Sequence, residues 1–430
     1  MIQALRGMKD VLPPESRKWE ELNKKAEDVF SCFGYELSIT PIVEKAELFV
    51  RSVGEDSDVV SKEMYTFKDR GEESITLRPE GTASIMRAYL SSPEWKGKFL
   101  KTWYWGPMFR YERPQKGRYR QFSQFGIEAI GSDSPYIDAE IIYMLAFFYK
   151  SIGVDDVAVE LNSIGCDDCR PSYKSELVKF FNSNKESLCS DCNNRLSTNP
   201  LRVLDCKKES CIDVVKKVPT IDAYLCNSCS SHQKKVLSLL DKTGVTYRQN
   251  LYLVRGLDYY TKTVFEFITE KLGGRQNALG GGGRYDSLST QLGEKAVSAV
   301  GYAGGIERTV MFMSDKRIDK DISVYLAVMD ANALDAYLPL VLEIKKELST
   351  LNTKHRVFFV NDDFKVRDIK KHLSRADKLG ASFAIIVGEN ELKKNTLILK
   401  DLSNKQGSDV KVDLVNIKDS AQEIARRLLG

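Results

Sequence analysis

An arginine and a glutamate in the N-terminal half have types and spacing suited to chemistry. Arg110 and Glu112 are two residues apart, so on a strand their side chains point to the same face. Such a pair could bind a phosphate and a donor amine of one ligand, although a surface ion pair is the common alternative and contributes little to stability. A further cation, Arg308, lies at the start of an apolar helical stretch, where ordinary helix surface is the alternative.

Basic residues are concentrated between positions 96 and 120. This stretch has eight Lys or Arg residues against one acidic residue, Glu112, whereas the whole chain has 64 basic and 60 acidic residues. Five Trp and Tyr residues lie among them, an arrangement that suits phosphates or nucleic acid. Because a solvated protein face usually mixes both signs of charge, we favour anion binding.

Eight of the nine cysteines lie between positions 166 and 229, and the ninth is Cys32. The eight form four pairs, three of which have the CxxC spacing of zinc knuckles. The start of the chain has no apolar core typical of a signal peptide, which favours a cytoplasmic protein without a disulfide framework. The alternatives are therefore structural zinc and reduced thiols. If zinc is bound, we expect a site made of Cys189, Cys192, Cys226 and Cys229, with the pairs Cys166/Cys169 and Cys206/Cys211 able to make a second.

The composition is typical of a soluble globular chain with two or three domains. Of its 430 residues, 42% are hydrophobic and 29% are charged, which is enough to fill real cores. No stretch approaches the roughly 18 uncharged apolar residues of a membrane span, so no membrane partner is expected.

The elements that must position these residues follow from hydrophobic periodicity. Residues 99–111 and 122–130 are predicted to form a long hairpin with a polar, charged loop over 112–120. Residues 280–286 are predicted to form a glycine-rich turn. The other elements expected in this part of the chain are helices over 15–33, 137–150 and 305–313 and strands over 38–43 and 263–267.

Two further regions differ in character. Residues 162–250 are rich in Cys, Asn and Ser and helical in patches, which indicates an inserted module. A charged break at 314–321 is predicted to be a linker. Beyond it strands and helices alternate, which predicts an α/β domain with a mostly parallel sheet.

Taken together, these segments resemble the class II aminoacyl-tRNA synthetases and, within them, the histidyl-tRNA synthetase family. The resemblance covers essentially the whole chain. It rests on the first helix with residues 40–44 (motif 1), 109–112 with its loop and return strand (motif 2), 301–308 (motif 3), 253–261 and 282–286 (similar to the two histidyl signature peptides), and 76–82.

The resemblance implies an architecture of three parts. An α+β catalytic domain built on an antiparallel sheet would span 1–161 and 251–320. An inserted, mostly helical Cys-rich module would span 162–250, and an α/β anticodon-binding domain would span 321–430. The family's motif 1 implies a homodimer.

The implied reaction is the ATP-dependent ligation of L-histidine to tRNA(His) through histidyl-adenylate, with release of AMP and pyrophosphate. Arg110 and Arg255 would bind the α-phosphate and Arg308 the γ-phosphate, as catalytic cations where negative charge develops. Glu112 would accept from the adenine amino group, and Arg118 completes the ATP-binding set. Mg²⁺ would bridge phosphate oxygens. The loop over 113–118 would contact the acceptor end of the tRNA.

The implied histidine-binding residues divide between the two ends of the amino acid. Glu128 and Tyr260 would offer one partner to each imidazole nitrogen. Tyr259 and Tyr285 are further candidates, with core aromatics as the alternative. The residues that match the family at the amine and carboxylate end are Glu80, Thr82 and Gln124, and Arg255 belongs to the histidine-binding set as well.

The competing hypothesis is a non-catalytic paralogue that binds histidine and regulates another enzyme. Such paralogues resemble the catalytic core but lack the anticodon domain and lose the ATP-binding residues. Because this chain has both, we favour the ligase.

Overall fold

The computed structural model describes residues 2–54, 57, 59–115, 117–257, 259–269, 277–313, 322–350, 357–360, 364–402 and 409–429. The predicted linker at 314–321 lies outside these residues, as do Lys116 and Asp258. The chain forms two compact units, Met1–Ser314 and Asp315–Gly430, and each is described by itself.

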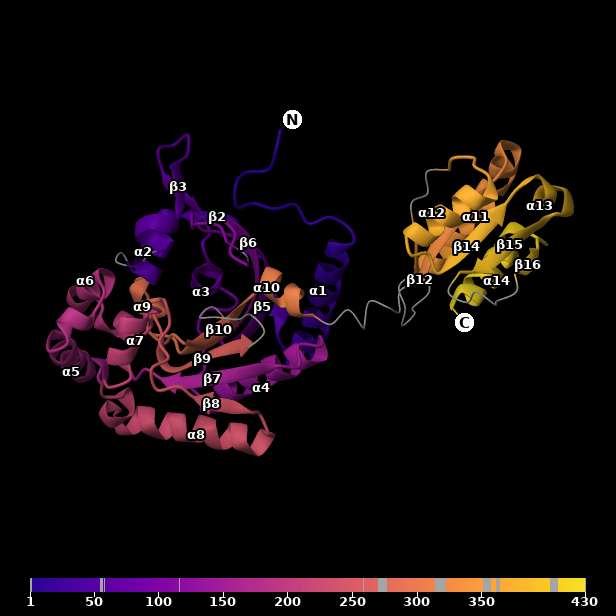
Figure 1. Cartoon of the computed structure of the whole chain (residues 1–430). Helices are drawn as coiled ribbons and strands as arrows, with labels where there is room; N and C mark the ends of the chain where they lie inside the picture. Colours follow the sequence, from indigo (N-terminus) through magenta and orange to yellow (C-terminus); the bar gives the residue numbers. More distant parts are fainter. Residues whose placement is uncertain are drawn as a thin grey trace. The chain divides into compact units, whose positions relative to one another are not determined.

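An eight-stranded sheet organises the described part of the first unit (Figure 1). The pairs from β5 to β7 are antiparallel, whereas β1/β5 and β7/β8 at the edges are parallel. The predicted hairpin is β5/β6, in which Tyr104 pairs with Gly126. In sheet order the strands are β1 (Glu36–Leu37), β5 (Leu100–Phe109), β6 (Gln121–Ile130), β11 (Ala299–Gly305), β10 (Ala278–Arg284), β9 (Thr261–Thr269), β7 (Val157–Ser163) and β8 (Tyr247–Gln249).

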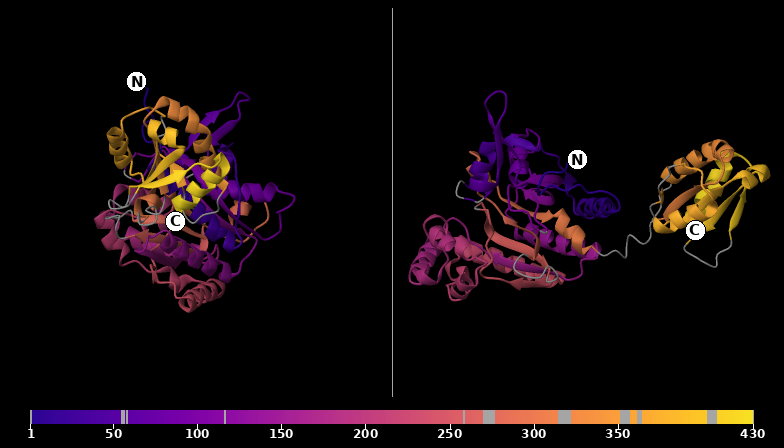
Figure 2. Two further views of the ribbon diagram at one scale, coloured as in Figure 1. Left: turned by 90° about the vertical axis from the view of Figure 1, so that its right-hand side faces the viewer. Right: turned by 45° about the horizontal axis from the view of Figure 1, so that its top comes forward.

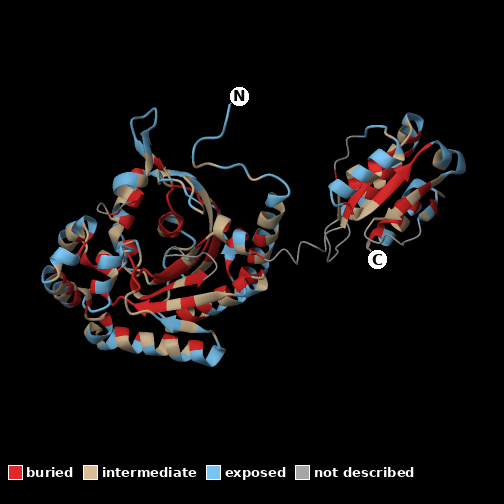
Figure 3. Cartoon of the chain, viewed as in Figure 1, coloured by how far each residue is buried: buried red, intermediate tan, exposed pale blue. Residues whose placement is uncertain are grey.

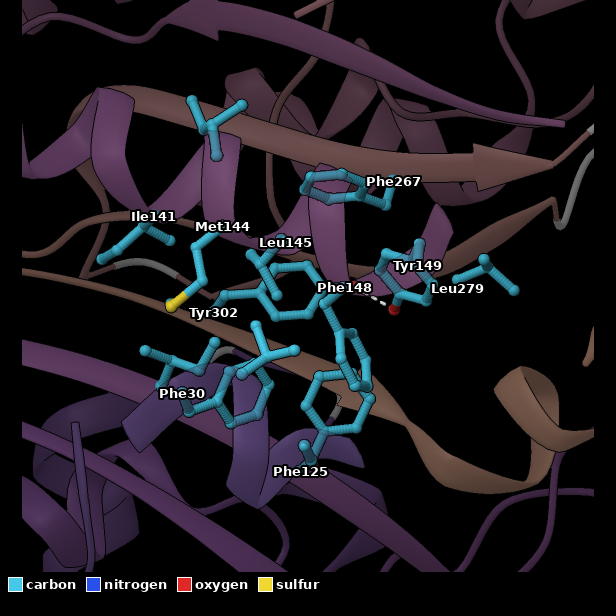
Figure 4. Close-up of a cluster of buried hydrophobic side chains, with 14 of the residues drawn as sticks. Phe30, Phe125, Ile141, Met144, Leu145, Phe148, Tyr149, Phe267, Leu279 and Tyr302 are labelled. Atoms are coloured by element: carbon cyan, nitrogen blue, oxygen red, sulfur yellow. Dashed lines mark hydrogen bonds between the residues drawn. The ribbon is translucent and has the colours of Figure 1, made fainter. Parts of the chain in front are cut away.

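One face of this sheet carries the main apolar core. Phe30 from the first helix packs against Phe125 and Phe148, with ring centroids 6.0 and 5.1 Å away. The hydroxyls of Tyr149 and Tyr302 lie 2.6 Å apart inside this core (Figure 4). Such dense aromatic packing makes this face a rigid support. The helices that supply it are α1 (Glu15–Cys32), α4 (Pro135–Ser151), α8 (Asn227–Thr243) and α10 (Ile306–Phe312).

The predicted glycine-rich turn is wrong, because residues 278–284 form strand β10 in the middle of the sheet. A Cβ at Gly282 would collide with the carbonyl oxygen of Gly301 on β11, and one at Gly281 with the guanidinium of Arg255. Glycine is needed here for close approach rather than for a turn. The strand predicted over 38–43, with a proline within it, is shorter than expected: β1 ends at Leu37, and of the predicted range only Val43 lies in a strand, at the start of β2 (Val43–Lys45).

Smaller elements cover the other face of the sheet. Strand β2 joins β4 (Ser74–Leu77) and β3 (Tyr65–Lys68) in a three-stranded sheet. Helix α3 (Thr82–Ser91) follows β4 directly and packs against this face. The neighbouring helical segments are α2 (Ala46–Val53), Val59–Glu63 and α9 (Leu288–Gln291).

The Cys-rich region is mostly helical and lies beside α9, β9 and β7 in Figure 1. Up to Leu225 its apolar side chains share a buried cluster with Tyr259, Tyr260 and Tyr285, so this part packs onto the same face as α3. Helix α8 packs instead into the main core on the opposite face. Burial alternates along these helices, as Figure 3 shows. The helices are α5 (Arg170–Asn182), α6 (Ser190–Thr198), α7 (Glu209–Val215), the start of α8, and short 3-10 turns at Lys185–Ser187, Pro200–Val203 and Ile221–Tyr224.

The second unit is an α/β sandwich, with helices on both faces of its sheet (Figure 2). The prediction of a mostly parallel sheet is wrong, because β12/β13 and β12/β14 are parallel but β14/β15 and β15/β16 are antiparallel. Helices α11 (Ala331–Thr350) and α14 (Ile417–Leu429) cover one face and α12 (Ile369–Lys378) the other. The strands, in sheet order, are β13 (Val357–Phe359), β12 (Ile322–Val328), β14 (Phe383–Val387), β15 (Thr396–Asp401) and β16 (Val410–Asp413), and α13 (Glu389–Lys394) precedes β15. None of the helices in the described ranges is long and apolar enough to cross a membrane.

Candidate functional site

The predicted site residues gather over the face of the first sheet that α3 covers. Three glycines of the central strands form the floor, and each leaves room for one large side chain. A Cβ at Gly126 would collide with the ring of Tyr104, one at Gly281 with Arg255, and one at Gly301 with Glu128. The floor is therefore built so that polar and charged side chains can lie flat across it.

Glu128 is the most deeply buried acid of the site. It lies on β6, is fully buried, and accepts a hydrogen bond from the Thr82 hydroxyl at 2.7 Å and one from the Tyr285 hydroxyl. Burial raises the pKa of Glu128 to about 8, although both hydroxyl donors oppose this shift. A carboxylate has about four acceptor positions, so Glu128 keeps capacity for a further donor such as an imidazole N–H.

Glu80 lies at the start of α3, beside Glu128. Its two carboxylate oxygens accept from the backbone N–H groups of Thr82 and Ala83, at 2.7 and 2.8 Å. Burial raises the pKa of Glu80, while these N–H groups lower it. The side-chain oxygen of Gln124, on the same strand as Glu128, is buried and has no hydrogen-bond partner among the described residues. These groups suit a ligand that brings its own N–H donors, such as an ammonium.

Three tyrosines form the wall between the two ends of the site. The ring of Tyr259 lies between Tyr260 and Tyr285, with centroids 4.7 and 5.8 Å away, and all three are buried. Tyr259 and Tyr285, the two further candidates for histidine binding, differ in their contacts. The Tyr285 hydroxyl donates to Glu128, whereas the ring of Tyr259 packs against the other two rings.

Arg255 lies at the far end of this wall, 6.0 Å from the ring centroid of Tyr260, and forms an ion pair with Glu266. Burial lowers the pKa of Arg255, but the Glu266 carboxylate and the Tyr260 hydroxyl outweigh that effect and raise it. Sequence reasoning missed Glu266. The available signal was a charged residue between Phe265 and Phe267 in a predicted strand.

Arg110 and Arg308 are held by backbone carbonyls. The Nε of Arg110 donates to the Pro79 carbonyl at 2.9 Å. The Nε and Nη1 of Arg308 donate to the carbonyls of Gly117 and Ala278, at 3.1 and 2.7 Å. Within the described ranges no carboxylate forms an ion pair with either guanidinium. Partly buried cations held by neutral carbonyls are well placed for an anionic ligand.

Glu112 and Arg118, predicted to bind ATP, form an ion pair with each other at 3.1 Å. The pair spans the hairpin loop, and Arg118 is 42% exposed while Glu112 is 20% exposed. Such a partly exposed pair is weak and can open for a ligand.

The chemistry of the two ends differs. Acidic groups, Glu80 and Glu128, lie at one end of the tyrosine wall, and the cation Arg255 lies at the other. The arrangement matches a ligand with nitrogen donors at one end and negatively charged groups at the other.

The raised pKa of Glu128 gives a prediction about pH. Between the ordinary pKa and the raised pKa, the carboxyl group of Glu128 is protonated in the folded chain but ionised in the unfolded chain. The contribution of this proton to folding stability is fully present below about pH 4.5 and is lost as the pH rises through about 8. We expect the unfolding free energy of the wild type to fall relative to Glu128→Gln by on the order of 1.4 kcal/mol per pH unit within that window. Denaturant unfolding of the ligand-free protein across this window would measure it, and a constant difference would contradict it.

The predicted grouping of the cysteines is wrong. Two separate clusters form, each with its sulfur atoms within 4.8 Å of one another, and Cys189/Cys192 and Cys226/Cys229 belong to different ones. The pairs Cys189/Cys192 and Cys206/Cys211 meet because their segments fold back on each other through α6 and α7. The other cluster joins the end of β7 to the start of α8, and consists of Cys166, Cys169, Cys226 and Cys229.

A buried ion pair that sequence reasoning missed ties this region to the site. Arg284 is fully buried and donates to the Asp138 carboxylate at 2.7–3.1 Å. The Nε2 of His232, on α8, lies 3.1 Å from the same carboxylate. Since Arg284 immediately precedes Tyr285, this network fixes the strand end that places the Tyr285 hydroxyl on Glu128.

Comparison with known proteins agrees with this geometry. A family model described as histidyl-tRNA synthetase matches residues 7–309, and one described as an anticodon binding domain matches residues 323–426. The histidine–tRNA ligase of Halothermothrix orenii is 42% identical over 427 residues, covering 98% of this chain and 99% of that protein. The structure of apo histidyl-tRNA synthetase of S. aureus has a TM-score of 0.75 at 32% identity and covers 100% of both chains.

A more distant neighbour shares the fold alone. It is described as an ATP phosphoribosyltransferase regulatory subunit/histidyl-tRNA synthetase from Bacillus halodurans C, and it has a TM-score of 0.61 at 20% identity over 90% of this chain. The matches at higher identity extend over the whole chain, including the second unit. The chain therefore belongs to the histidyl-tRNA synthetase family.

Proposed function

We infer that the chain is a histidine–tRNA ligase. It joins L-histidine to tRNA(His) in two steps, first forming histidyl-adenylate and pyrophosphate from ATP and then transferring the histidyl group to the 3′-terminal ribose. The observation that carries this proposal is the site with Glu128 buried at one end and Arg255 at the other, separated by the tyrosine wall.

The acidic end binds histidine. Glu128 accepts an imidazole N–H while Thr82 and Tyr285 hold its carboxylate in place, and Tyr260 partners the second ring nitrogen. Glu80 and Gln124 accept from the α-ammonium. Other amino acids are rejected because they leave these buried polar groups without partners.

The cationic end binds ATP. In the first step a carboxylate oxygen of histidine attacks the α-phosphorus and the bond to the pyrophosphate oxygen breaks, so negative charge accumulates on the phosphoryl oxygens. Arg110 and Arg255 stabilise that charge, and Arg308 binds the γ-phosphate. Glu112, released from Arg118, accepts from the adenine amino group. Because these cations are already fixed by carbonyls and by Glu266, they need little reorganisation.

Magnesium is required by this chemistry as a counter-ion of the phosphates. Synthetases of this class use ATP with Mg²⁺ in general, and the ion neutralises phosphate charge when bound. Glu266, the carboxylate that pairs with Arg255, would be the side chain placed to help hold the ion, which would bind mainly to phosphate oxygens.

The tRNA meets two parts of the chain. Residues 113–118 contact the acceptor end, and the second unit, over 321–430, contacts the anticodon. The catalytic domain spans 1–161 and 251–320, with the insert over 162–250 between its halves. We further propose that the enzyme is a cytoplasmic homodimer. A regulatory role without catalysis is less well supported, since the ATP-binding arginines and the anticodon binding domain are both present.

Amino acid-dependent exchange of pyrophosphate into ATP tests the proposal. We expect histidine alone among the amino acids to support exchange, followed by transfer to tRNA(His) in an aminoacylation assay. Histidine binding without exchange would instead establish the regulatory alternative.

A further inference from the structure

The two cysteine clusters have the dimensions of tetrathiolate metal sites. All eight thiols are free, and Sγ–Sγ distances are 3.6 Å for Cys166–Cys169 and 4.0 Å for both Cys166–Cys226 and Cys189–Cys206. A disulfide requires about 2.05 Å. Four sulfurs at the Zn–S distance of about 2.3 Å occupy the corners of a tetrahedron whose edge is about 3.8 Å. The observed spacing therefore fits a central ion and not an S–S bond.

Backbone N–H groups also point at the thiols. The N–H of Cys226 donates to the Sγ of Cys169 at 3.1 Å, and the N–H of Cys189 donates to the Sγ of Cys211 at 3.2 Å. These bonds connect the two CxxC or CxxxxC segments of each cluster across the ring of sulfurs. Such donors stabilise the thiolate form, which is the form that binds metal.

Near each cluster in the sequence lies an arginine whose side chain donates a hydrogen bond to the backbone of the loop that carries Arg255. Arg170, next to Cys169, donates to the carbonyl of Tyr260 at 2.9 Å. Arg202, in the turn before Cys206, donates to the carbonyl of Gly256. The Cys166 cluster thus positions the contact at Tyr260, the end of the segment 253–260, and the Cys189 cluster positions the contact at Gly256, beside Arg255.

We propose that each cluster binds one zinc ion through four thiolates, and that the two ions fasten the inserted module to the 253–260 segment. Binding forms four S–Zn bonds and releases the thiol protons to solvent, leaving a site with a net charge of −2. No oxidant or reductant takes part. The ion assignment does not depend on the proposed function, whereas the role of the fastened segment in histidine activation rests on it.

Metal analysis of protein purified without chelator tests the sites. We expect two zinc ions per chain, one for each cluster. Cys226→Ser and Cys206→Ser should each lose one ion and keep the other, while Cys32→Ser, which alters an exposed cysteine outside both clusters, should keep two. If Cys206→Ser kept the full complement while Cys226→Ser lost it, one site combining Cys189, Cys192, Cys226 and Cys229 would replace the proposal.

Cobalt titration of the wild-type chain gives an answer even if a variant fails to fold. Two equivalents of Co²⁺ should produce the charge-transfer and d–d bands of tetrahedral tetrathiolate cobalt, and zinc should abolish both. Fewer than about 0.1 metal ions per chain, with eight thiols reactive or oxidised in pairs, would overturn the metal assignment.

Hydrogen exchange tests the fastening separately from catalysis. Removing both metal ions from the wild type should speed amide exchange in residues 253–257 and 259–260, whereas Cys226→Ser should speed it at 259–260, the end that Arg170 holds; β5 and β6 should stay protected in both. If exchange in that segment stayed unchanged after the metal was shown to be lost, the ions would stabilise the insert alone, and the proposal that they fasten it to the segment would be wrong.

Discussion

We expect Glu128→Ala to abolish histidine activation and Glu128→Gln to lower kcat/KM for histidine by about 10²–10³-fold, because a buried partner of a cationic or N–H donor ligand is worth roughly 2–5 kcal/mol. ATP binding should stay nearly intact in both variants, since the side-chain partners of Glu128 are Thr82 and Tyr285 and not the arginines proposed to bind phosphate. Pyrophosphate exchange at varied histidine concentration gives kcat/KM for histidine, and calorimetry gives the affinity for ATP.

A glutamate on the opposite face of the same sheet provides the matched control. Glu140 accepts from Lys101 at 2.6 Å and lies on α4, outside the site. Glu140→Gln should therefore leave kcat/KM for histidine unchanged. Near wild-type exchange in Glu128→Gln would mean that the imidazole binds elsewhere.

Local periodicity predicted the framework that carries the site. The apolar spacing of 15–33 indicates α1, and alternation along 99–111 and 122–130 indicates the β5/β6 hairpin, because each of these elements buries one face against a neighbour. Alternation also places Gln124 and Glu128 on one face of β6. The resemblance then supplied roles for these residues, and those roles stay predictions until the variants are measured.

Close approaches between distant segments could not be predicted in the same way. The glycines of β10 indicate a turn by local propensity, yet they are required by Arg255, Tyr302 and the Gly301 carbonyl, which come from other parts of the chain. The cysteines pose the same problem, because spacing identifies pairs but only the fold of α5–α8 decides which pairs meet. Glu266 was missed because its partner, Arg255, lies on a loop and not on a paired strand.

Arg255 has the second large expected effect. Its guanidinium lies at the end of the tyrosine wall and pairs with Glu266. In the proposed mechanism it would contact the α-phosphoryl group, where charge develops in the transition state. Loss of one such preorganised donor typically costs about 10²–10³-fold in rate. Arg255→His should fold, bind both substrates and form the adenylate slowly, with kcat reduced far more than KM is raised. An unchanged single-turnover rate of adenylate formation would remove Arg255 from the mechanism.

Gly281→Ala tests the position of Arg255 without removing its charge. A Cβ at Gly281 would overlap the guanidinium carbon and both terminal nitrogens, so the side chain must leave the floor of the site. We expect the rate of adenylate formation to fall toward that of Arg255→His, since displacement by about 1 Å can cost about 10²-fold. Gly256→Ala is the control, because it adds the same methyl group on the residue after Arg255, where no atom beyond the two chain neighbours lies within 4 Å of the new Cβ. Wild-type rates of adenylate formation in both alanine variants would show that catalysis does not require the position of the Arg255 guanidinium over β10.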